Sequence, residues 1–192
     1  MAEYLVWKDH VPGHEYASVQ SESGIDLLQI QAVRRGQRLD PPPLGITINT
    51  LTQGPLPDVV SSGWGGRYVS TTPKQILEKH VQLEFLQFFP AMLAPRLGAT
   101  AHTLWLMNVA ATAMCVDSEN SDVDRSPSAA RAIRTVRKLV LVPMADSAPG
   151  LLHIAELPSV LLIRSDIADA LRHGVRTPGD FVPISEYRRG VV

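Results

Sequence analysis

Three consecutive prolines at positions 41–43 constrain the fold of this chain more than any other feature of its sequence. Proline lacks a backbone N–H and its ring fixes φ, so such a run fits neither a helix interior nor a central strand. We therefore expect a boundary or an extended connector within residues 34–45. This boundary predicts an N-terminal strand and loop subregion, residues 1–45, packed on a main α+β domain, residues 46–192.

The rest of the pattern predicts an α+β fold with a mixed or antiparallel sheet. Short runs rich in β-branched, aromatic and other apolar residues predict strands. These runs are residues 3–7, 46–51, 103–107, 138–142, 151–156 and 160–163. The order contains no strict alternation of strand and helix, which favours α+β over a doubly wound fold.

Two helices are expected. One long buried helix is predicted over residues 68–93, because Ser70 and Pro73 suit a helix start and apolar residues then follow on all sides. A short C-terminal helix is predicted over residues 166–173, with Gly174 as its C-cap.

Three further segments carry weaker signals. Residues 25–33 favour a strand over a short helix, and residues 129–136 favour a short helix. Residues 117–128 are polar, acidic and rich in serine, which predicts a loop.

Composition limits the compartment and the partners. The chain has 192 residues, 45% of them hydrophobic, which suits one domain with a substantial core. Its single cysteine, Cys115, allows no intrachain disulfide, and the N-terminus lacks the pattern of a secretory signal. His102 and Asn108 interrupt the longest apolar stretch, residues 99–116, so we expect core rather than a membrane span. These features predict a cytoplasmic protein without a membrane partner.

Charge is balanced over the whole chain and uneven along it. The net charge of −1 lacks the basic excess typical of nucleic-acid binders, so no nucleic-acid partner is expected. Residues 117–124 contain only acidic charges, whereas residues 131–138 contain only basic ones. This asymmetry is the main electrostatic feature of the sequence.

No local motif carries catalytic chemistry. The chain has no G-x-S-x-G elbow, no P-loop and no dinucleotide-binding glycine run, and residues 63–66, GWGG, predict a turn with positive φ. His10 and His14 flank Pro12 and Gly13, so they cannot share a helical face as zinc ligands do. Cys115 lies in an apolar run, where a thiol is inert. We therefore expect no catalytic residue, metal or cofactor, and not an enzyme.

Two features are candidates for protein contact. The first is the acidic run, whose members are Asp117, Glu119, Asp122 and Asp124. It is either a solvated loop or a negative surface for a basic partner; a calcium loop would need a central glycine and a distal glutamate that it lacks. In the second interpretation, reversing its acids to lysine slows association with the partner. The other candidate is Trp64, either an exposed binding anchor or a plug that packs its own loop.

The order of segments resembles a known family. Three segments carry the resemblance: Leu56-Pro57-Asp58, Tyr68-Val69-Ser70 with the following PKQILEKH, and LWLMNVAATAMCVDSENSDV. They are similar to the eleventh family of polymorphic-toxin immunity proteins, first described as a domain of unknown function. The similarity continues through His153-Ile154, Pro158, residues 162–166, Gly179 and Phe181-Val182-Pro183. It covers roughly residues 56–187. Departures are Pro90 and Pro95 and the absence of a phenylalanine near His153.

The resemblance implies a function. An immunity protein stays in the cytoplasm of the producing cell, binds a toxin made for neighbouring bacteria and neutralises it, and needs no catalytic residue or cofactor. Two alternatives stay open: a secretion adaptor or chaperone for an effector, and a small hydrolase whose site is dispersed in sequence.

Overall fold

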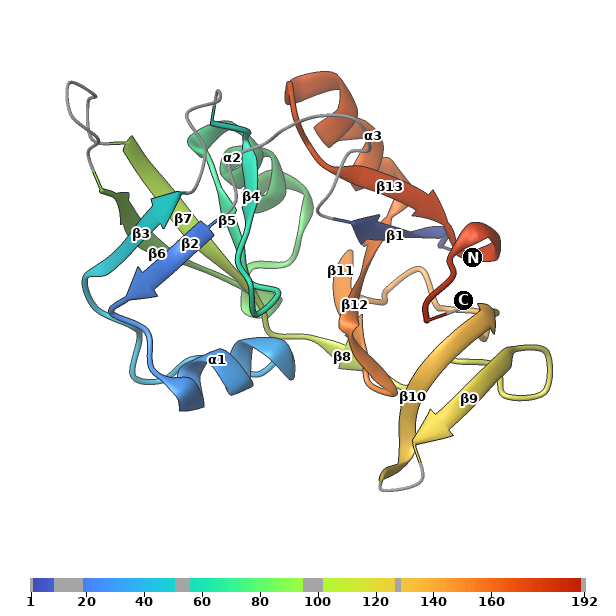
Figure 1. Cartoon of the computed structure of the whole chain (residues 1–192). Coiled ribbons are helices and arrows are strands. Elements are labelled where there is room, and N and C mark those ends of the chain that lie inside the picture. The colour runs from blue at the N-terminus through green and yellow to red at the C-terminus, as the bar shows by residue number, and fades with distance from the viewer. Residues whose placement is uncertain (1, 9–18, 51–55, 95–101, 127–128, 191–192) are drawn as a thin grey trace.

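The computed structural model of the protein describes residues 2–8, 19–50, 56–94, 102–126 and 129–190, which form two mixed sheets, a hairpin and three α-helices (Figure 1). The strands are β1 (Tyr4–Lys8), β2 (Val19–Ser23), β3 (Ile46–Thr50), β4 (Val59–Ser61), β5 (Arg67–Val69), β6 (Leu86–Leu93), β7 (His102–Val109), β8 (Thr112–Ala113), β9 (Asp122–Ser126), β10 (Ala129–Lys138), β11 (Leu151–Ile154), β12 (Leu157–Arg164) and β13 (Asp180–Pro183). The helices are α1 (Leu27–Arg34), α2 (Thr71–His80) and α3 (Ser165–Gly174), with short 3-10 turns η1 (Leu83–Phe85) and η2 (Ile184–Glu186).

The larger sheet has the strand order β2-β3-β6-β7-β5-β4 and contributes to a core on each of its faces. Only the β3–β6 pair is parallel; the others are antiparallel. Side chains of a strand point alternately to the two faces. On β7, Leu104 and Leu106 therefore join a small core with Val33 of α1, whereas Met107 and Val109 join the main core on the opposite face.

The smaller sheet has the order β13-β1-β12-β11-β8, and the N-terminal strand lies inside it. Trp7 of β1 faces Leu161 of β12 on one side and Phe181 of β13 on the other. This sheet, α2 and α3 surround the main core. Because β1 belongs to this sheet while β2 and α1 lie with the other, the first 45 residues contribute to both halves of the fold.

The long buried helix expected over residues 68–93 is not present. Helix α2 ends at His80, and residues 86–93 form strand β6, paired with β7 along its whole length. Apolar residues on all sides also suit a strand in a sheet covered on both faces, and the sequence alone does not separate the two cases. Pro90 is tolerated because β3 pairs only with the strand beyond it, from Ala91 to Leu93.

Three weaker predictions are also corrected. Residues 27–34 form helix α1 rather than a strand, because Asp26 and Gln29 form a reciprocal capping box at its start. Residues 129–138 form strand β10 rather than a helix, and the predicted loop contains strand β9 at its end. These two strands pair with each other, and no local sequence signal predicts this pairing.

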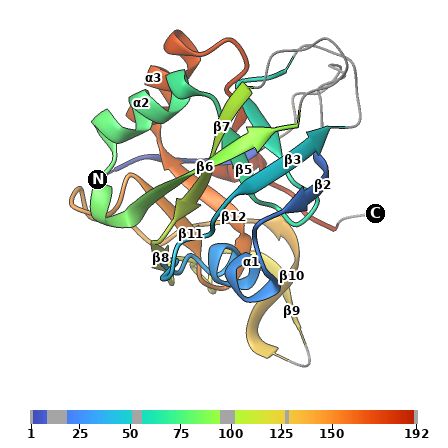
Figure 2. The ribbon, with the colours of Figure 1, turned by 90° about the vertical axis from the view of Figure 1, so that its left-hand side faces the viewer.

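The short C-terminal helix lies where it is predicted, as α3. Ile167, Ala168 and Leu171 form its buried face, and it packs beside α2, as both ribbon views show, while α1 lies at the opposite end of the molecule (Figures 1 and 2). Among the described residues, no helix has the length and apolar character needed to cross a membrane.

Candidate functional site

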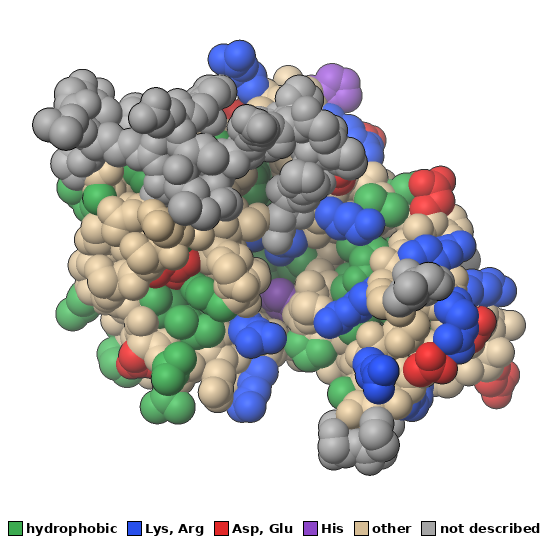
Figure 3. Space-filling view, in the orientation of Figure 1, with side chains coloured by type: hydrophobic (Ala, Val, Ile, Leu, Met, Phe, Trp, Pro, Cys, Tyr) green, Lys and Arg blue, Asp and Glu red, His purple; other side chains and the backbone are tan. Residues whose placement is uncertain are grey.

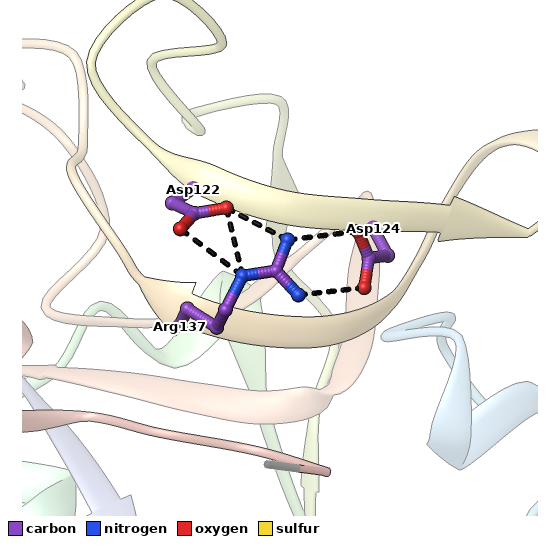
Figure 4. Close-up of polar contacts among 3 residues, drawn as sticks. All are labelled: Asp122, Asp124 and Arg137. Carbon is purple, nitrogen blue, oxygen red and sulfur yellow. Dashed lines mark hydrogen bonds and ion pairs between the residues drawn. The ribbon is translucent and has the colours of Figure 1, made fainter.

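The acidic and basic runs of the sequence neutralise one another across the β9–β10 hairpin. Register places Asp124 opposite Thr135 and Asp122 opposite Lys138, so Arg137 lies between the two aspartates. Its guanidinium binds Asp122 at 2.8 Å and Asp124 at 2.8 Å (Figure 4). These bonds raise the pKa of Arg137, and its guanidinium lowers the pKa of Asp124. The charge asymmetry seen along the chain is therefore largely cancelled in space.

The other two acids of the run lie in the turn before β9. The Asp117 carboxylate accepts hydrogen bonds from the Asn120 side chain at 2.8 Å and from the backbone N–H of Glu119 at 3.0 Å. The bonds from Asn120 are the main reason why the pKa of Asp117 is lowered. Glu119 is exposed. Asp117 thus stabilises its own turn, whereas the carboxylate of Glu119 is exposed and forms no ion pair among the described residues.

Trp64 lies away from the hairpin and is half-buried against the small core. Its indole N–H donates to a carboxylate oxygen of Glu22 at 2.6 Å, and the buried Tyr68 hydroxyl donates to the same oxygen at 2.9 Å. The GWGG motif makes this possible: Gly65 has φ +90°, and a Cβ on Gly66 would lie 2.1 Å from the Trp64 ring. The glycines therefore let the indole fold back over its own turn.

A cleft runs along the seam between the two sheets, close to this turn. Its most enclosed part, about 90 Å³, lies between the Trp64–Arg67 segment and His153 of β11. Two wider grooves, about 420 and 330 Å³, continue from it past α1 and past β1. Ser159 near the start of β12 lines all three parts, so they adjoin one another at this residue.

Positive charge gathers around this cleft. Its lining contains one carboxylate, from Glu156, and six cationic side chains: Lys8, Arg34, Arg35, Arg67, Arg188 and Arg189. Figure 3 shows Lys and Arg side chains around the hollow between the two halves of the molecule. Within the described residues, Arg34, Arg35, Arg188 and Arg189 form no ion pair with a carboxylate. Like charges held around a depression focus a positive potential there.

Secondary structure holds these cations in place. Arg34 and Arg35 lie at the C-terminal end of α1, where positive charge is favourable beside the helix dipole. Arg67 of β5 is buried; it donates to the Trp7 carbonyl at 2.8 Å and lies over the Trp7 ring. Arg189 is held by backbone pairing with Val136 of β10, and its guanidinium donates to the Ser159 hydroxyl. The positive lining is therefore largely preformed.

His153 lies in the enclosed part of the cleft and is neutral at physiological pH. Its Nδ1 is 2.8 Å from the Pro158 carbonyl oxygen. Burial, followed by the nearby charge of Arg67, lowers the pKa of His153 to about 4.

We predict that stability falls as the pH drops from about 6.5 towards 4, through His153. Over this range the unfolded chain takes up a proton at this histidine, with a pKa near 6.5, whereas the folded chain does not. Above pH 6.5 the residue has no effect, and below its folded pKa the loss levels off at no more than about 3 kcal/mol. Chemical denaturation of the wild type and of His153→Gln measures this. Parallel pH profiles for the two proteins would contradict this prediction. The carboxylates with lowered pKa values do not mask the effect, because they change the stability only below about pH 4; they are Asp117, Asp124 and Asp166.

Two ionisable side chains near the cleft, those of Glu156 and Cys115, are buried. Glu156 is 6% exposed, and one of its carboxylate oxygens has no hydrogen-bond partner among the described residues. Cys115 is buried, and burial, followed by the charge of Glu156, raises the pKa of its thiol to about 12. The thiol is therefore protonated near neutral pH and is a poor nucleophile.

The other residues considered for chemistry do not converge. His80 is exposed at the end of α2, and His10 and His14 lie outside the described residues. In the part of the chain that the structure covers, no group of three or more His, Cys, Asp or Glu side chains is placed to hold a metal ion.

No known family model matches this chain. A search of curated proteins also finds no similar one.

Sequence reasoning missed the arginines of the cleft because they come from three separate segments, 34–35, 67 and 188–189. A signal for them does exist, since Arg34-Arg35 and Arg188-Arg189 are adjacent pairs without a neighbouring acid. Neither pair is part of the basic run 131–138, which together with the acidic run forms the main electrostatic feature of the sequence. Only the packing of α1 and the C-terminal segment against the start of β12 brings the pairs to one cleft.

Proposed function

We propose that this protein is an immunity protein, which binds a toxin made for other bacteria and neutralises it in the cell that produces it. The observation that carries the proposal is the preformed cleft, with six cationic side chains and one carboxylate in a chain of net charge −1. Charge concentrated in this way speeds association and selects partners. Because residues 56–187 resemble immunity proteins, we infer that the partner is a toxin.

The proposed role makes specific demands on the fold. Binding a toxin in a fixed orientation favours a preformed surface, and helix α1 and sheet strands form much of the cleft lining, together with the C-terminal segment 187–189. It requires no reacting group, and the buried thiol of Cys115 and the neutral His153 are compatible with that.

Co-expression with the product of the neighbouring gene tests the proposal. We expect that product to stop growth when it is expressed alone, and to lose this effect when the present protein is expressed with it. The two proteins should also co-purify. A neighbour that is harmless alone but needs this protein for secretion would assign the adaptor role, and equal toxicity in both strains would refute immunity.

A further inference from the structure

We propose that the arginine-lined cleft is the partner-binding surface, and that it takes a carboxylate-rich segment of a protein. This inference rests on the proposed immunity function for the identity of the partner, but the surface and the chemistry of its ligand come from the cleft alone. It places the contact in the cleft rather than on the acidic side chains of β9.

The first step is the distribution of accessible charge. At the hairpin, Arg137 already occupies the carboxylates of Asp122 and Asp124, so a basic partner would have to displace it. At the cleft, Arg34 and Arg35 are exposed and make no ion pair within the described residues. The cleft therefore presents accessible positive charge that no carboxylate of the described residues neutralises.

The second step is the donor set. Arginine presents N–H groups in a planar fork that matches a carboxylate, and such pairs are stronger than neutral hydrogen bonds. Arg34 and Arg35 come from one wall of the cleft, and Arg188 and Arg189 from the other. A segment lying along Ser159 would therefore meet guanidinium groups on both sides.

The third step is the choice between protein and nucleic acid. The chain has a net charge of −1 and so lacks the basic excess typical of nucleic-acid binders. In the hairpin whose strand β10 lines the groove, Asp122 and Asp124 already hold Arg137, which is therefore not available to the phosphates of a long nucleic acid. A protein segment fits both observations.

The test uses two probes with the purified full chain: an inactivated form of the neighbouring gene's product, and a labelled oligoglutamate peptide. We expect Arg34→Glu with Arg35→Glu, and Arg188→Glu with Arg189→Glu, each to weaken binding of both probes by at least about tenfold at low ionic strength. Lys79→Glu with Arg176→Glu is the matched control, since both side chains are exposed and lie outside the cleft lining. This variant, with the same change in net charge, should stay within about twofold of wild type.

A second control addresses the hairpin. Asp122→Asn with Asp124→Asn removes the acids without adding charges beside Arg137 and should leave binding unchanged. Unchanged association after the cleft reversals would overturn the inference, as would a loss confined to the aspartate variant or tighter binding of an oligothymidylate than of the peptide. Circular dichroism and unfolding midpoints establish that each variant is folded.

The outcomes separate the two proposals. If wild type binds the toxin and the cleft reversals do not weaken it, the cleft is wrong and the immunity function stands. If the cleft binds oligoglutamate, and the reversals abolish this, while the neighbour's product is neither bound nor toxic, the immunity function fails and the ligand class stands.

Discussion

Replacing Trp7 by alanine is expected to lower the free energy of unfolding by about 3–5 kcal/mol, the largest effect of any single change considered for this protein. Trp7 is 1% exposed and lies on β1, which pairs with β12 on one side and β13 on the other. Its indole N–H donates to the Pro178 carbonyl at 2.8 Å, and its ring contacts Phe181. Alanine would leave a large cavity and an acceptor without its donor.

Chemical denaturation of Trp7→Ala measures this loss, with Trp7→Phe as the control. Phenylalanine keeps most of the apolar volume and loses the indole donor, so we expect a cost of only about 1–2 kcal/mol. The Trp7 ring also supports the Arg67 guanidinium at the cleft. An alanine variant as stable as wild type would show that β1 is not an essential part of the sheet.

The second large effect is expected at Glu22, whose carboxylate joins β2 to the turn that carries Trp64. Glu22→Ala removes the acceptor shared by the Trp64 indole and the Tyr68 hydroxyl. Tyr68 is fully buried, and burial together with the Glu22 charge raises the pKa of its hydroxyl, which therefore stays protonated and needs an acceptor. We expect a loss of about 2–4 kcal/mol, because two donors lose their partner.

A double-mutant cycle isolates the interaction. Glu22→Ala, Tyr68→Phe and the double variant are compared by denaturant unfolding, and we expect a coupling free energy of about 1 kcal/mol or more between the two residues. Glu22→Gln keeps an acceptor oxygen and should cost less than Glu22→Ala. Additive effects of the two single changes would show that the Tyr68 hydrogen bond contributes nothing to stability.

Secondary structure was predicted correctly where a local sequence signal is sufficient to determine it. The β-branched and aromatic runs of β1 and β3 and the amphipathic pattern of α3 were predicted correctly, because the residues that decide these elements are adjacent in sequence. The predicted C-cap of α3 was wrong, since Gly174 is the last helical residue and Val175 is the C-cap. The run 83–93 was misjudged because strand β6 contributes Leu86 to the main core and Phe89 to the small core, and segments far away along the chain complete both cores. Apolar residues on all sides then fit a helix and a strand equally well.

The acidic residues show the same limit of sequence-based prediction at the candidate site. By itself, the sequence determined that residues 117–124 and 131–138 carry opposite charge, that Trp64 sits between glycines, and that arginines occur in two adjacent pairs. Only the tertiary structure decided that the two runs pair across a hairpin and that the arginine pairs meet at one cleft. The physical reason is that charge is a property of single residues, whereas the potential at a surface is the sum over residues that folding brings together.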